Sequence, residues 1–174
     1  MPSRSYTSRR ELEEYHFTSL VTLLVPFALL LLQVLLPRLV PLVAILDLPL
    51  LAVVYFSVAR RSPIAGTATG TAIGLLQDAL SGQPIGVHGM ADALIGYGAS
   101  SIGIQVDVDA LTTRILMIFG FSLFDSGLLF LIHRSLLGDA HFPFWWLREV
   151  VRAVLNSALA IPLFLVLDRF RQRD

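Results

Sequence analysis

Hydrophobic residues occur along this chain in long, nearly uninterrupted runs that are separated by short polar links. A helix needs about 20 consecutive apolar residues to cross the hydrocarbon core of a bilayer, and several of these runs approach that length. The pattern therefore predicts an all-α integral membrane protein with six transmembrane helices. The predicted spans cover residues 17–36, 39–59, 63–80, 86–103, 112–133 and 150–167.

Two of these spans carry helix-start signals. The second apolar run is interrupted by Pro41, Asp47 and Pro49. An Asp side chain accepts a hydrogen bond from a free N–H at a helix start, and Pro is tolerated in the first turn. We therefore expect a short interfacial piece over residues 39–46 and a helix that begins after Asp47. Ser62 followed by Pro63 predicts the start of the third span in the same way.

Polar segments flank the predicted membrane region, and an even number of spans places both on the same side. Cytoplasmic links of membrane proteins are enriched in basic residues. With both ends in the cytoplasm, nine arginines lie inside and four outside. We therefore predict a cytoplasmic segment at residues 1–16, a six-helix domain at residues 17–168 and a cytoplasmic tail at residues 169–174.

Aromatic residues gather in the link before the last span, which this orientation places at the outer interface. Amphipathic rings are favoured there, so we interpret the group as an interfacial anchor, with a dedicated binding site as the alternative. The group consists of Phe142, Phe144, Trp145 and Trp146.

Composition narrows the available chemistry. Only 15% of the residues are charged, against about 25% in a soluble domain. The chain has no Cys and all of its 13 basic residues are Arg, which excludes thiolate catalysis, Cys-ligated metals and Schiff-base lysines. The net charge of zero implies no bulk attraction to nucleic acid. No catalytic motif is present, so we expect a non-enzymatic protein without a cofactor or metal.

The most distinctive stretch is a ladder of small residues in the third span. Gly66, Gly70, Gly74 and Asp78 are each four residues apart, which places them on one face of a helix. Glycines allow helix backbones to approach closely in a bilayer, where no hydrophobic drive brings helices together. The ladder predicts either internal packing or a docking groove for the helix of a partner.

Carboxylates inside the spans are the main candidates for polar chemistry. An ionised carboxylate at the centre of a bilayer costs roughly 2.5 to 3.5 kcal/mol on insertion scales, so Asp78, Asp92 and Asp125 each require a partner, a wet cavity or a proton. Arg152 is a candidate partner for Asp125 or Asp92. His88 lies four residues before Asp92, which is too loose a pattern to predict a metal site. A proton-coupled transporter would use such carboxylates, so that class remains open.

The stretch from residue 47 to residue 97 resembles the core of the MreD family of bacterial rod-shape-determining membrane proteins. Its features are an Asp/Pro pair, a G-L-x-x-D sequence, an S-G-x-P-x-G turn and a closing G-Y. They fall on Asp47 and Pro49; Gly74, Leu75 and Asp78; Ser81, Gly82, Pro84 and Gly86; and Gly96 and Tyr97. The order Asp then Pro departs from the more usual Pro then Asp.

The resemblance implies a non-enzymatic scaffold of the elongation machinery in the inner membrane, which helps control peptidoglycan synthesis and rod shape. Family members act with MreC, which has one membrane helix and a periplasmic coiled coil, and with MreB, RodA and a class B penicillin-binding protein.

The fold of this family is similar to that of the substrate-binding subunits of ECF vitamin transporters. That similarity supplies the alternative function, a substrate-binding subunit of a small-molecule transporter. Residues 17–36 lack the A-x-x-x-A docking motif of those subunits.

We expect eight positions of this core to serve helix packing or the binding of MreC, with membrane lipid as a further partner. These residues are Gly66, Gly70, Gly74, Asp78, Gly86, Asp92, Gly96 and Tyr97.

Overall fold

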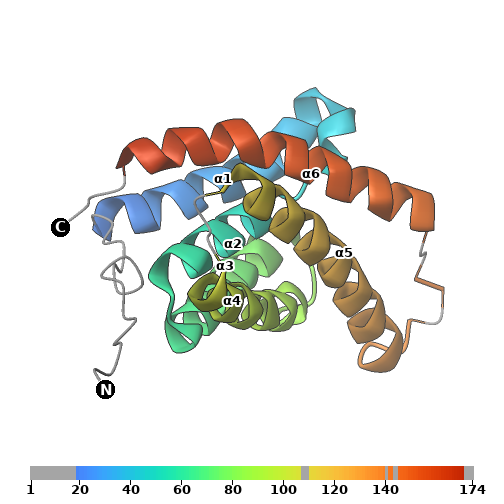
Figure 1. Ribbon diagram of the computed structural model, residues 1–174. Helices are drawn as coiled ribbons and strands as arrows, with labels where there is room; N and C mark the ends of the chain where they lie inside the picture. The colour runs from blue at the N-terminus through green and yellow to red at the C-terminus, as the bar shows by residue number, and fades with distance from the viewer. Residues whose placement is uncertain (1–18, 107–109, 140, 143–144, 171–174) are drawn as a thin grey trace, which may run out of the picture.

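The computed structural model describes residues 19–106, 110–139, 141–142 and 145–170 (Figure 1). The segment predicted at residues 1–16, Phe144 and the end of the predicted tail lie outside these residues. The described chain is α-helical, with two short 3₁₀ helices, which confirms the predicted all-α class. The elements are α1 (Ser19–Leu39), η2 (Pro41–Ile45), α2 (Leu48–Arg60), α3 (Pro63–Ser81), α4 (Val87–Gln105), α5 (Leu111–Ser135), α6 (Trp146–Leu167) and η3 (Asp168–Phe170).

The predicted helix starts are found where the sequence places capping groups. Asp47 is the N-cap of α2, and its Oδ1 accepts a hydrogen bond from the Leu50 N–H at 3.2 Å. Ser62 caps α3 by accepting from the Ala65 N–H at 3.4 Å. The predicted interruption over residues 39–46 is the 3₁₀ helix η2.

Several helices extend beyond the apolar runs that predicted them, and the extension is longest in α1 and α6. α1 continues through Pro37 to Leu39, and α6 begins at Trp146 instead of residue 150. The first turn of α6 contains Glu149, a favourable charge for the free N–H groups at a helix start. Hydrophobicity therefore located the apolar part of each span but not the polar turns at its end.

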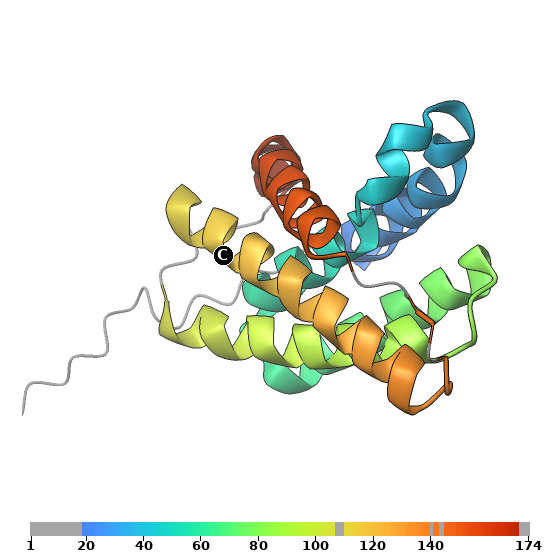
Figure 2. The same ribbon diagram turned by 90° about the vertical axis from the view of Figure 1, so that its right-hand side faces the viewer.

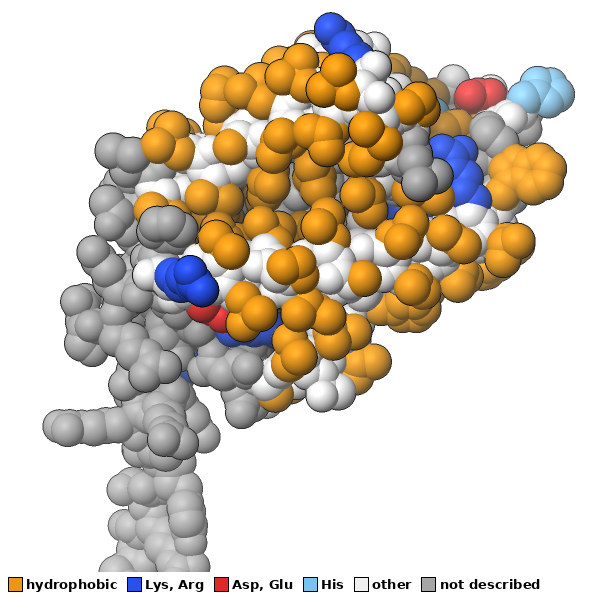
Figure 3. Space-filling view, turned by 90° about the horizontal axis from the view of Figure 1, so that it is seen from above, with side chains coloured by type: hydrophobic (Ala, Val, Ile, Leu, Met, Phe, Trp, Pro, Cys, Tyr) orange, Lys and Arg blue, Asp and Glu red, His pale blue; other side chains and the backbone are white. Residues whose placement is uncertain are grey.

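Three of the described helices are long and apolar enough to cross a membrane, namely α1 over Val21–Leu39, α5 and α6. The helix α2 is apolar but has only 13 residues. These three candidate spans support a membrane protein. Apolar side chains also dominate the outer face shown in Figure 3.

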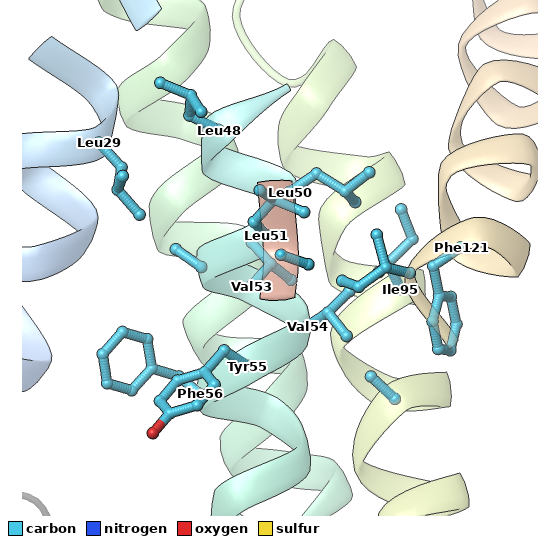
Figure 4. Close-up of a cluster of buried hydrophobic side chains, with 14 of the residues drawn as sticks. Leu29, Leu48, Leu50, Leu51, Val53, Val54, Tyr55, Phe56, Ile95 and Phe121 are labelled. Atoms are coloured by element: carbon cyan, nitrogen blue, oxygen red, sulfur yellow. The ribbon is translucent and has the colours of Figure 1, made fainter. Parts of the chain in front are cut away.

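The helix α2 forms the centre of the molecule. It packs against α1, α3 and α4, and it also contacts α5 and α6. The side chains of Leu51, Val53 and Phe56 are completely buried, and Figure 4 shows them surrounded by residues of neighbouring helices such as Ile95 and Phe121. The apolar side chains of α2 are therefore packed against other helices of the protein.

The helices α3 and α4 form an antiparallel hairpin beside α2, and α5 packs on α4 (Figures 1 and 2). The helix α6 packs on α5 and lies on the same side of the hairpin as α1. This arrangement brings the ends of α1, α3 and α5 together with the starts of α2, α4 and α6.

Candidate functional site

The glycine ladder of α3 lies against the backbone of α4. A Cβ atom at Gly66, Gly70 or Gly74 would overlap a backbone carbonyl oxygen of α4. The carbonyl groups concerned belong to Gly96, Asp92 and His88, respectively. The ladder face is therefore filled by the same chain, which matches the internal-packing interpretation and leaves no groove there for a partner helix.

The facing surface of α4 is equally close. A Cβ at Gly96 would overlap the carbonyl oxygen of Gly66. Four residues further on, the buried Ser100 hydroxyl donates a hydrogen bond to the Ser57 carbonyl oxygen at 2.8 Å, which ties α4 to α2. The side chain of Tyr97 is 56% exposed and takes no part in this interface.

Asp78 caps the start of α4 from the end of α3. Its carboxylate is completely buried. Oδ2 accepts hydrogen bonds from the N–H groups of Gly86 and Gly89 at 2.8 and 3.3 Å. Oδ1 accepts from the N–H of His88 at 3.1 Å and lies 2.7 Å from the Nδ1 atom of the same His88. A carboxylate at a helix N-terminus is stabilised both by the free N–H groups and by the helix dipole.

The turn between α3 and α4 explains the glycines of the motif. Gly82 ends α3 with φ of 70°, and Gly86 precedes α4 with φ of 105°. Both angles lie in the left-handed region, where side chains with a Cβ are strained. The G-L-x-x-D and S-G-x-P-x-G features therefore specify one capped helical hairpin.

A second polar group joins α6 to α2 and α5. Arg152 forms an ion pair with Oδ2 of Asp125, as the sequence predicted for one of its two candidate partners. The Arg152 guanidinium also lies 3.7 Å from an oxygen of Asp47 and 3.7 Å from an oxygen of Glu149. The role of Glu149 was missed, although its position three residues before Arg152 is a sequence signal for such a contact.

Asn156 extends this group one turn further along α6. Its Oδ1 accepts a hydrogen bond from the Asp47 N–H at 3.0 Å, and its Nδ2 donates to the Ser122 hydroxyl at 3.1 Å. The residue is fully buried. The start of α2 is thus held by a residue 109 positions away in the chain.

Asp92 differs from the other carboxylates in the helices. Its side chain is 2% exposed, and its Oδ2 has no hydrogen-bond partner among the described residues. The Oδ1 atom of Asp125 is also without a partner in that part of the chain. The sequence placed both residues inside spans but did not indicate which of them would be left partly unpaired.

A cavity of about 560 Å³ opens where the helix ends meet. Its walls come from α1, η2, the N-cap of α2, α3, the start of α4, α5 and the start of α6. Polar residues contribute much of the lining, including Gln33, Arg38, Asp47, Gln77, Gln83, His88, His133, Arg148, Glu149 and Arg152.

Two residues of this lining have a buried atom without a hydrogen-bond partner among the described residues, the Nε of Arg152 and the Oε1 of Gln77. Gln77 is 7% exposed, and its Oε1 accepts no hydrogen bond from the described residues. The three glutamines of the lining were not singled out from the sequence, because an isolated Gln in a helix carries no signal of its own. The spacing of four residues between Gln77 and Ser81, and the position of Gln77 relative to the glycine ladder, show only which face of α3 Gln77 occupies.

At the opposite end of the molecule, polar contacts join three helices. The Tyr55 hydroxyl donates to Asp168 Oδ1 at 3.0 Å, and Arg114 forms an ion pair with Asp168 Oδ2 at 2.5 Å. These residues connect α2, α5 and the end of α6, and they line a small, mainly apolar pocket of about 20 Å³.

Part of the predicted aromatic group lies near the cavity. Phe142 stacks on His133 with ring centroids 4.1 Å apart, and both residues line the cavity. Trp145 and Trp146 are 69% and 73% exposed. Within the described residues, no group of three or more His, Asp or Glu side chains is placed to hold a metal ion.

The chain was compared with known families, curated proteins and solved structures. The family described as rod shape-determining protein MreD matches residues 15–173. No curated protein and no solved structure matches the chain. Since the family match covers nearly the whole sequence, the protein belongs to the MreD family of rod shape-determining membrane proteins.

Proposed function

We propose that this protein is a non-enzymatic scaffold of the bacterial elongation machinery, which binds MreC and so helps control peptidoglycan synthesis. Family membership supports a role in rod shape determination. The geometry adds that Asp78 and Arg152 serve contacts between helices, an arrangement that stabilises a scaffold. MreB, RodA and a class B penicillin-binding protein are the further partners, reached directly or through MreC.

The proposal includes six spans of the inner membrane, with residues 17–168 as the membrane domain and residues 1–16 and 169–174 in the cytoplasm. At 19 residues each, α3 and α4 are about 28 Å long, close to the roughly 30 Å of a hydrocarbon core. Their glycines and Asp78 face one another instead of lipid. The helix α2 would cross with the help of η2, and the overall arrangement would be similar to the ECF substrate-binding subunits.

The cavity is the observation that carries the proposed MreC site. The ladder is filled by α4, so a partner must dock elsewhere. In the proposed orientation the cavity faces the periplasm, where MreC continues from its membrane helix into its coiled coil. The unpartnered Gln77 Oε1 would accept a hydrogen bond from a backbone N–H. Arg38 and Arg148, which form no ion pair with other described residues, would bind acidic groups.

Co-purification of MreC with a Gln77→Leu variant tests this site. The two side chains have similar volumes, so the fold should be retained, while one buried hydrogen bond to the partner is lost. We expect about tenfold weaker retention of MreC, which corresponds to about 1.4 kcal/mol. The matched control is Gln105→Leu, which replaces an exposed glutamine at the end of α4 that is remote from the cavity. Equal retention of MreC by both variants would contradict the proposed site.

The alternative function is a substrate-binding subunit of a small-molecule, vitamin-type transporter. The same cavity favours it, because its volume lies within the roughly 300 to 1,000 Å³ typical of ligand pockets. Native mass spectrometry of the purified protein separates the two functions. A stoichiometric small molecule that is lost in Gln77→Leu would support the transporter subunit, and a bound mass made up only of lipid would count against it.

A further inference from the structure

Four carboxylates lie in the region beneath the cavity, and three of them surround one guanidinium. We call Asp47, Asp92, Asp125 and Glu149 the acidic cluster. Arg152 contacts Asp125 directly and lies 3.7 Å from both Asp47 and Glu149. Asp92 follows Ala91 on α4, and Ala91 belongs to a buried apolar cluster with Leu129, which lies four residues after Asp125 on α5.

Two oxygens of this cluster are buried and unpaired. Asp92 Oδ2 and Asp125 Oδ1 have no hydrogen-bond partner among the described residues, and the side chains are 2% and 1% exposed. A buried polar group without a partner costs free energy, and a buried charge costs more. The two orphaned acceptors belong to α4 and α5, which pack against each other.

The charges in this region do not balance. The acidic cluster and Arg152 carry a net charge of −3 when all five groups are ionised. Asp78 adds a further carboxylate on α3, and its oxygens already have hydrogen-bond partners in the α4 N–H groups and His88. The other titratable or charged groups around the cavity are Arg38 on α1, His88 on α4, His133 on α5 and Arg148 on α6. An excess of buried carboxylates in a low-dielectric region favours a bound positive charge.

The cavity provides a route for that charge. Asp47, Glu149 and Arg152 belong both to the cavity lining and to this polar group. A small cation in the cavity therefore meets Asp47 and Glu149, the outer members of the acidic cluster, and Arg152 connects these to Asp125, which like Asp92 is not part of the lining. The absence of a three-residue chelating group in the described part of the chain argues against a divalent metal.

We propose that Asp92 and Asp125 bind one monovalent cation, either a proton or Na⁺, between α4 and α5. The bound cation offsets the excess of carboxylates and gives both orphaned oxygens a partner. It joins the hairpin to the α5–α6 pair, so the packing of these two parts depends on the ion supply outside the membrane.

Thermal unfolding of the purified full-length protein in detergent tests the proposal. In one arm Na⁺ replaces choline at constant ionic strength and pH 8, and in the other the pH is varied in choline alone. A saturable rise in Tm with Na⁺ identifies sodium, and a rise in Tm as the pH falls without a Na⁺ effect identifies a proton. Asp92→Asn and Asp125→Asn should each remove the dependence seen in the wild type, because the amide supplies its own donor.

The control is Asp139→Asn, which changes an exposed carboxylate in the loop after α5. It should retain the full dependence on Na⁺ or pH. A wild-type Tm that responds to neither ion would overturn the proposal even if a variant fails to fold. So would a dependence that is unchanged in a folded Asp92→Asn protein.

Discussion

The α3–α4 hairpin and the region between α1, α5 and α6 accommodate buried polar residues in opposite ways. Both parts carry polar residues inside a largely apolar chain. In the hairpin, glycines bring the backbones together and Asp78 is bound by three N–H groups and His88. Beneath the cavity, Asp92, Asp125 and Gln77 retain unpaired oxygens, although Asp92 and Gln77 belong to the two hairpin helices. The comparison supports the proposal that the close contact between α3 and α4 provides stability and that the region around the cavity binds a partner.

The largest expected effect comes from filling the ladder. In Gly70→Leu the added side chain would collide with the Asp92 carbonyl, a backbone group that cannot move aside. Overpacking that shifts backbone costs about 3 kcal/mol or more, so we expect little folded protein. Gly120→Leu on the exposed face of α5 meets no atom within 4 Å and should unfold like the wild type. Yield and Tm in detergent measure both. A folded Gly70→Leu protein would remove the basis of the hairpin.

Arg152→Met is the next largest change, because it leaves the acidic cluster without its guanidinium. Breaking a buried ion pair on one side costs about 3 to 5 kcal/mol. The double variant Arg152→Met/Asp125→Leu removes both charges and should recover part of that loss. Chemical denaturation of the wild type, the single variant and the double variant measures the free energy of unfolding of each. Equal stability of the single and double variants would show that Asp125 does not depend on Arg152.

Asp78→Asn and Asp92→Asn compare two buried carboxylates that differ in their partners. The Asp78 variant loses an anionic acceptor of several hydrogen bonds, so we expect a loss of about 1 to 3 kcal/mol. The Asp92 variant removes a charge whose Oδ2 has no described partner, so its stability at low Na⁺ and alkaline pH should be unchanged or higher. Tm measured under those conditions tests both. Equal losses in the two proteins would erase the difference between the two regions.

Tyr97→Ala should have the smallest effect. The ring is 56% exposed and lies outside the hairpin interface, although it closes the family motif. Surface substitutions change stability by about 0.5 kcal/mol or less. A larger drop in Tm would indicate that Tyr97 contributes to the fold, and loss of MreC with an unchanged Tm would place a partner contact there.

Local features of the fold could be predicted from the sequence, because they depend on neighbouring residues. The Asp47 cap, the Ser62–Pro63 start and the common face of the ladder follow from spacings of at most four residues or simple multiples of four. The pairing of Arg152 was narrowed to two carboxylates by charge alone. The sequence does not predict which helix packs against the glycine ladder, because small residues allow a close approach without determining the partner helix.

The cavity could not be predicted, because distant contacts set its width. The hydrogen bond between Asp47 and Asn156 fixes how far α2 lies from α6, and no periodic pattern records a contact over 109 residues. Gln33, Gln77 and Gln83 come together only after α1 and α3 have docked. The extra turn of α6 was hidden for a simpler reason: Arg148 and Glu149 are polar, so a search for apolar runs begins after them.

Photo-crosslinking in living cells tests the central claim that MreC docks at the cavity and not at the hairpin. A photoreactive residue is placed at Gln83 on the cavity lining and, as a control, at Ile64, which is 85% exposed. Ile64 lies in the first turn of α3, at the end of this helix remote from the cavity. We predict a crosslink to MreC from position 83 and none from position 64. A crosslink from position 64 with none from position 83 would contradict the account.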